Sequence, residues 1–193
     1  MPSAIANLRA EHRSISAVLS GLRELARMAR ESSTRPDFAA LRAMIFYIDE
    51  FPEKLHHPKE DKYLFARLLA RAPQAAALID RLRGEHVEGA RRLRDLERAV
   101  LGVEQTWPEG TAQFQAAVDD YAEFQWRHMR CEEQELLPLA ERSLMAEDWA
   151  AIEAAFAAND DPLAGVGERE YRRLFQRITQ IAPAPVGLGA PWK

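Results

Sequence analysis

The sequence predicts an all-α protein, an up-down-up-down four-helix bundle with a short C-terminal helical extension. First, apolar residues recur at steps of three and four, which is the helical period, and strand-like alternation is absent. Second, four such stretches of roughly 25–35 residues are separated by short segments rich in Ser, Thr, Gly and Pro. Third, 193 residues suffice for one domain with a proper core, or for one domain with a small appendage.

The first two helices are expected on either side of a short loop. The first runs from about Ser3, a good N-cap, to about residue 31, and a loop follows over 32–36. The second begins near Pro36, since proline is tolerated in a first helical turn, and continues to about residue 71. Pro52 and Pro58 lie inside it, so we expect a kink or a local break there.

The third helix is expected to start at Pro73 and to run to about Leu101. Residues 102–110 contain Gly, Thr and Pro and predict a loop. A fourth helix then spans about residues 111–142.

The pattern changes after residue 143, which divides the chain into a bundle over 1–143 and a C-terminal helical extension and tail over 144–193. We expect the extension to pack over the bundle or to form a dimer contact. It should contain a short helix over 147–158, a turn at 159–162, a helix over 168–181 and an extended or mobile tail over 182–193.

Composition narrows the partners and the compartment. A net charge of −4 with a pI near 5.8 argues against a nucleic-acid footprint or an anionic-membrane anchor, and no apolar run reaches the length of a membrane span. The N-terminus lacks the layout of a secretory signal. Cys131 is the single cysteine, which excludes an internal disulfide and fits a reducing compartment. We therefore expect a cytoplasmic protein that binds neither nucleic acid nor membrane.

An internal repeat relates the two halves of the bundle. The phrase Leu-Arg-x-Glu-His occurs at 8–12 and again at 82–86. The phrase His-x-x-x-Glu occurs at 56–60 and again at 128–132, in each case before Leu at the same spacing. Each half thus supplies one histidine from its first helix and one His-x-x-x-Glu from its second.

Residues four apart lie on one helix face, so the repeat places histidines and glutamates together in the core. A buried carboxylate costs several kcal/mol unless it is paired, and no Arg or Lys lies near the centre of these stripes. Two divalent metals bridged by Glu60 and Glu132 would satisfy the groups, with one histidine pair on each ion. Imidazole and carboxylate ligands suit Fe, Mn or Zn, and open positions remain for O₂, NO or peroxide. The candidate metal ligands are His12, His56, Glu60, His86, His128 and Glu132.

Four further residues have weaker assignments. His57 is expected to be solvated or to support the ligands. Tyr63 and Glu135 follow the two HxxxE histidines by seven residues, so both are expected to face the pocket, where Glu135 could transfer protons. Cys131 is expected to be a small buried residue, with redox activity as the alternative.

With these motifs the sequence resembles the hemerythrin-like family, also called HHE cation-binding domains. The resemblance covers most of residues 1–143, and it implies a four-helix bundle with a non-haem di-iron centre held by the same six residues. Oxygen-carrying members have a further histidine four residues on in the third helix, where this chain has Ala90. They also place Asp where this chain has Glu133, which becomes a substitute bridge if the helix bulges. These departures weigh against reversible O₂ carriage. The motifs that carry the resemblance are Glu11-His12-Arg13, His56-His57-Pro58-Lys59-Glu60-Asp61 with Leu64-Phe65, Glu85-His86, and His128-x-x-x-Glu132-Glu133-x-x-Leu136-Leu137-Pro138.

Three functions follow from this interpretation. The first is a protein with two Fe ions, or Mn or Zn as substitutes, that binds a small diatomic gas or peroxide for sensing, storage or detoxification. The second is a di-iron oxidoreductase or an iron-donating repair protein, so the sequence leaves open whether the chain is an enzyme. The third, ranked low, is a ferritin-like site or a metal-free scaffold, because only residues 53–56 form the Glu-x-x-His pair that ferritin-like sites use twice. A homodimer also remains open.

Overall fold

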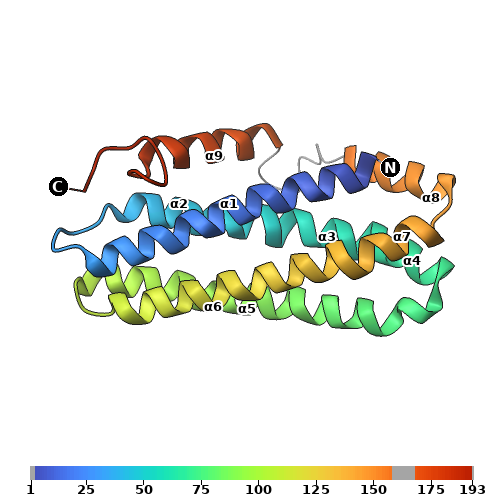
Figure 1. Ribbon diagram of the computed structural model, residues 1–193, viewed down its shortest axis with the longest axis horizontal. Helices are drawn as coiled ribbons and strands as arrows, with labels where there is room; N and C mark the ends of the chain where they lie inside the picture. Colours follow the sequence, from blue (N-terminus) through green and yellow to red (C-terminus); the bar gives the residue numbers. More distant parts are fainter. Residues whose placement is uncertain (1–2, 158–167, 193) are drawn as a thin grey trace.

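The computed structural model describes residues 3–157 and 168–192, and it confirms the predicted all-α four-helix bundle (Figure 1). Four helical rods run alternately up and down, and no β-strand occurs among the described residues. The first rod is α1 (Ser3–Glu31), and the third is α5 (Ala76–Thr106), which follows a 3₁₀ turn, η3 (Pro73–Ala75). The second rod comprises α2 (Phe38–Ile48), η1 (Asp49–His56), α3 (His57–Lys59), η2 (Glu60–Phe65) and α4 (Ala66–Arg71), and the fourth comprises α6 (Thr111–Cys131), η4 (Glu132–Leu136) and α7 (Leu137–Ser143).

Helix α2 begins at Phe38, two residues after Pro36, where the sequence predicted its start. Asp37 is its N-cap, and its carboxylate accepts a hydrogen bond from the backbone N–H of Ala39 at 2.9 Å. This bond satisfies one of the donors that a helix N-terminus leaves free, which explains why the helix starts after Asp37 rather than at Pro36.

The second rod does not break at its prolines. Instead it widens into the π-helical segments η1 and η2, and the fourth rod widens likewise at η4. A proline cannot donate to the carbonyl four residues back, and its ring clashes with that carbonyl. In the wide turns, hydrogen bonds reach five residues back, from the N–H of His57 to Pro52 and from the N–H of Leu137 to Glu132. The expected kink is therefore replaced by wide turns that keep the rods continuous.

Helix α5 extends past its expected end at Leu101. Gly102 lies within the helix, and Val103 is buried one turn on from Val100. The helix ends at Thr106, because the next residue, Trp107, precedes Pro108 and takes extended angles of φ −47° and ψ 134°. The predicted loop is correspondingly shorter.

Two apolar clusters enclose a polar layer. The first apolar cluster includes Leu19 and Leu22 of α1, and the second apolar cluster includes Ile5 and Leu8 of the same helix. His12 lies between them, and each other rod repeats this order. Each fully buried leucine contributes about 1.5–3 kcal/mol, so the apolar layers offset the cost of burying polar groups at mid-bundle.

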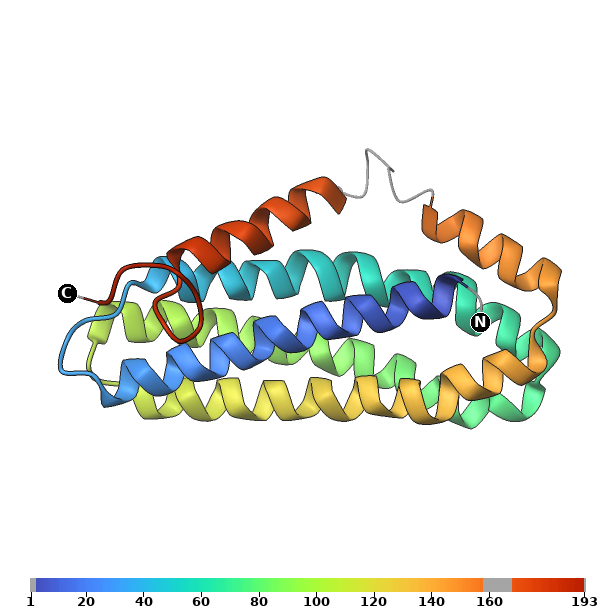
Figure 2. The ribbon, with the colours of Figure 1, turned by 45° about the horizontal axis from the view of Figure 1, so that its top comes forward.

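Beyond residue 143, two more helices pack outside the bundle (Figure 2). Helix α8 (Ala146–Ala157) contacts α1 and η2, and α9 (Glu168–Ile181) lies along α2. The turn predicted at 159–162 lies outside the described residues. The division of the chain into two domains after residue 143 stays a prediction.

The expectation of an extended or mobile tail is wrong for residues 182–192. The tail folds back in tight turns, with the N–H of Gly189 donating to the carbonyl of Ala182 at 2.8 Å. Val186 reaches the bundle at Gly21, where an added Cβ would lie 2.9 Å from its Cγ1. At Gly187 a Cβ would lie 2.4 Å from a carbonyl oxygen of α9, so only glycine fits there. No helix in the described part of the chain is both long and apolar enough to cross a membrane.

Candidate metal centre

The six candidate ligands converge in the polar layer, and each rod contributes to the set. Their donor atoms form two overlapping groups, within each of which all atoms lie within 4.8 Å of one another. Both glutamates belong to both groups, as carboxylates that bridge two ions must. One group is His12, His56, Glu60 and Glu132, and the other is Glu60, His86, His128 and Glu132, and all six residues are at most 6 % exposed.

The distances fit ligands that share an ion. The two oxygens of Glu132 face opposite histidines, with Oε2 3.3 Å from Nε2 of His12 and Oε1 3.3 Å from Nε2 of His128. Nε2 of His86 lies 3.1 Å from that of His128. Two adjacent ligands at about 2.1 Å from one metal ion are separated by about 3 Å. Small adjustments would therefore bring these atoms into coordination.

Several of these donor atoms have no hydrogen-bond partner. Nε2 of His12 and His56, Oε2 of Glu60 and both oxygens of Glu132 are buried and unpartnered. Each buried polar atom without a partner costs about 1–3 kcal/mol. Because the unpartnered atoms are those that point at the centre of the group, the donor set fits a pair of cations.

A second set of carboxylates holds the imidazoles in this orientation. Each of the four histidines uses Nδ1 to contact an acid, which leaves Nε2 directed into the bundle. A hydrogen bond from Nδ1–H fixes the tautomer whose Nε2 lone pair is free to bind metal. The four contacts are His12–Glu133 at 2.9 Å, His56–Glu11 at 2.7 Å, His86–Asp61 at 3.2 Å and His128–Glu85 at 2.8 Å.

These carboxylates follow the internal repeat. Glu11 and Glu85 each precede a ligand histidine and contact the other imidazole of the same half. Asp61 and Glu133 each follow a ligand glutamate and contact an imidazole of the opposite half. Glu133 is thus not a substitute bridge, because it orients His12 while Glu132 faces the centre.

The two central carboxylates differ in their protonation. Burial raises the pKa of Glu60 well above its usual range, and the negative charge of Glu132 raises it further. Burial also opposes ionisation of Glu132, but His128, together with His12, outweighs burial and holds the pKa of Glu132 well below its usual range. Without a cation the pair therefore holds one proton and one negative charge.

Two of the histidines balance this negative charge, because the carboxylates favour their protonated form. Burial lowers the pKa of His128, but the negative charge of Glu132, together with the hydrogen bond to Glu85, outweighs burial and raises the pKa to about 10. The pKa of His12 is raised in the same way, whereas burial lowers the pKa of His56 in spite of Glu11. The metal-free pocket therefore holds protons that a metal ion would displace.

Lys59 is a buried cation that the sequence analysis missed. Its Nζ lies 3.2 Å from Oε1 of Glu11, the carboxylate that contacts the candidate ligand His56. Burial would raise the pKa of Glu11, but the hydrogen bond with His56 and the charge of Lys59 lower it to about 2. Glu11 is therefore ionised when it orients the imidazole.

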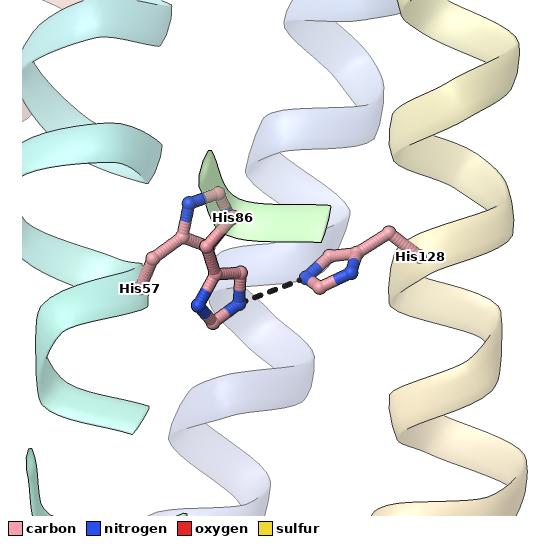
Figure 3. A group of neighbouring side chains, drawn as sticks. All are labelled: His57, His86 and His128. Carbon is pink, nitrogen blue, oxygen red and sulfur yellow. Dashed lines mark hydrogen bonds between the residues drawn. The ribbon is translucent and has the colours of Figure 1, made fainter. Parts of the chain in front are cut away.

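His57 is buried beside the centre rather than solvated, with 5 % of its surface exposed (Figure 3). Its ring stacks on His86, with centroids 4.2 Å apart and planes 11° apart, and it meets His128 edge-on at 5.4 Å. Burial, together with the neighbouring imidazoles, lowers its pKa well below the usual value. Of the two places expected for His57, the structure therefore favours the one in support of the ligands.

The other weakly assigned residues are not among the metal-binding groups of the described residues. Glu135 is 57 % exposed and pairs with Arg81, so its expected place in the pocket is wrong. Tyr63 packs against the second apolar cluster. Cys131 is only partly buried, and its Sγ lies 2.6 Å from Nη2 of Arg81.

The fold and the centre together define a metal-binding helical-bundle protein. The chain matches the family described as the hemerythrin HHE cation binding domain over residues 3–140. Since this match covers most of the chain, the protein belongs to that family, as the motifs indicated. No curated protein and no solved structure matches the chain.

Proposed function

We propose that this protein binds two metal ions, iron in the cell, at the six converging residues. His12 and His56 would bind one ion, His86 and His128 would bind the other, and the two central glutamates would bridge them. The supporting observation is that the six buried residues fall into two groups sharing both carboxylates, and that donor atoms of His12, His56 and the two glutamates have no hydrogen-bond partner. Manganese or zinc would suit the same donors.

We further propose that the loaded centre binds O₂, NO or peroxide for sensing, storage or detoxification. A di-iron pair would supply redox-active coordination positions, since two imidazoles and two shared carboxylates leave each ion short of six ligands. The chain's own part is to hold the imidazoles in one tautomer through the outer carboxylates. The apolar clusters on both sides exclude bulk water from the layer.

Metal stoichiometry tests the first proposal. Elemental analysis of protein from iron-replete cells, and titration of the metal-free protein with Fe²⁺ under anaerobic conditions, should give two ions per chain. Glu60→Gln and Glu132→Gln should each lower the stoichiometry or the affinity, whereas Glu135→Gln at the exposed surface should change neither. Fewer than one ion per wild-type chain would contradict the proposal.

Absorption spectroscopy tests the second. Addition of O₂ to the anaerobically loaded protein should produce the absorption band of an oxo-bridged di-iron centre. A featureless spectrum in a fully loaded protein would refute a di-iron centre that reacts with O₂. Catalytic turnover with peroxide or a nitrogen oxide, rather than one event per chain, would favour an enzyme.

A further inference from the structure

The ligands of the centre are repeated in the two halves of the bundle, but the residues next to them are not. His57 corresponds in the repeat to Met129, 72 positions later. His57 lies against the His86–His128 pair, whereas Met129 is buried in the first apolar cluster with Ile15. The two ion positions therefore have matching ligands but differ at this neighbour, which is an imidazole at one position and a thioether at the other.

A connected set of polar groups extends from His57. Oε1 of Glu53 accepts a hydrogen bond from the hydroxyl of Tyr121 at 3.1 Å and another from Nε2 of Gln125 at 3.3 Å. Its Oε2 lies 3.5 Å from Nδ1 of His57. Helix α5 presents Gly89 here, and a Cβ at this position would press on Gln125 and Glu53 at 3.2 and 3.3 Å. The glycine thus lets these polar groups approach the centre.

His57 is not placed as a ligand of the same ion as His86. An imidazole binds a metal ion in its own ring plane, and two stacked, nearly parallel rings cannot both contain one ion in their planes. Yet a ring nitrogen of His57 lies within 4.8 Å of the donor nitrogens of His86 and His128. Its Nδ1 is buried and forms no hydrogen bond, but it lies 3.5 Å from Oε2 of Glu53, so the N–H left for a ligand at the ion is that of the other ring nitrogen, Nε2. A buried N–H donor gains from any acceptor placed within its reach.

We infer that the small ligand binds at the ion held by His86 and His128, and that His57 donates a hydrogen bond to it. This inference rests on the proposed function, and it deepens it by naming the ion position and the class of ligand. A hydrogen-bond donor beside the ion favours a ligand that accepts well, such as peroxide, over a poor acceptor such as NO. At the other ion the corresponding position in the repeat is Met129, whose side chain has no N–H to donate.

Azide binding to the iron-loaded, oxidised protein tests the inference, with Met129→Leu as the matched control from the other half. His57→Leu should weaken azide binding at least about tenfold, since hydrogen bonds to charged groups carry this much affinity, while two ions remain bound. His57→Gln keeps an N–H donor and should bind azide more tightly than His57→Leu. Met129→Leu should stay close to the wild type. Circular dichroism of each variant confirms that it is folded.

Each alternative result has one meaning. Equal azide affinity in wild type and His57→Leu, or equal weakening by Met129→Leu, would overturn the inference. Loss of one ion from His57→Leu would also overturn it, because His57 would then be a ligand of the metal. A wild-type protein that holds two ions but no azide would refute the inference alone, whereas one that holds no ions would refute the proposed function itself.

Discussion

Replacing Glu53 with glutamine should change how stability depends on pH. Burial raises the pKa of Glu53 from an ordinary 4.5 to about 7, although the hydrogen bond from Tyr121 opposes the shift. Between these two values the folded protein holds the proton more tightly than the unfolded chain does. The contribution of Glu53 to the free energy of unfolding should therefore fall as the pH rises from 4.5 to 7.

The size of the effect follows from the two pKa values. The difference between about 7 and 4.5, at about 1.36 kcal/mol per pH unit, gives a loss of at most about 3.4 kcal/mol above pH 7. Glutamine keeps the size of the side chain and an oxygen that accepts from Tyr121, but it does not titrate. The free energy of unfolding of the variant should therefore exceed that of the wild type by up to this amount at pH 8, and by little at pH 4.5.

Urea denaturation of the metal-free proteins across this pH range measures the effect. The difference in unfolding free energy between variant and wild type is the quantity to follow, because the histidine titrations are shared by both proteins and largely cancel. Glu135→Gln, at an exposed position, should give a difference that is small and flat with pH. A flat difference for Glu53→Gln as well would refute the argument that burial keeps this carboxyl protonated.

Three further predictions concern the centre and the tail. Metal binding at pH 7 should release protons, because the pKa of His128 is about 10 in the metal-free protein and a ligand imidazole must be neutral. Heats of metal binding that do not vary with the ionisation enthalpy of the buffer would contradict this prediction. Glu11→Gln should lower metal affinity about 10–100-fold, as loss of an orienting carboxylate does, with Glu135→Gln unchanged in the same titration. Gly187→Ala should lower the melting temperature, whereas Gly102→Ala should raise stability by about 0.5–1 kcal/mol, since a Cβ at Gly102 meets nothing within 4 Å.

The sequence alone predicted the bundle and the convergence of the six candidate ligands. Helical period and the duplicated His-x-x-x-Glu phrase are local signals, and regular packing of four rods turns them into proximity. The sequence left His57 either solvated or supporting the ligands, because a helical wheel assumes a constant turn, whereas the second rod contains π segments beside the site. Glu53 was noted only as part of a Glu-x-x-His pair, because its hydrogen-bond partners Tyr121 and Gln125 lie on another rod.

The remaining features that the sequence did not predict depend on contacts between residues far apart in the chain. The acids that orient the imidazoles are visible in the sequence as neighbours of the ligands, but their hydrogen bonds join different rods. Lys59 is buried through its contacts with Glu11 and the ring of Phe156, which lies in the extension. The tail is ordered by contacts with α1 and α9 that its Pro- and Gly-rich composition does not disclose.

The hydrogen bonds of Asp61 and Glu133 run between the two helix pairs, and this makes each pair dependent on the other. A chain severed between residues 72 and 73 would retain two of the four candidate ligand imidazoles on each fragment. One of those imidazoles would lack its orienting acid, because that acid lies on the other fragment. If the proposed centre of two ions is correct, each fragment alone would bind metal weakly, because it would also lack one of the two shared glutamates, and docking of the fragments would raise the affinity for both ions together.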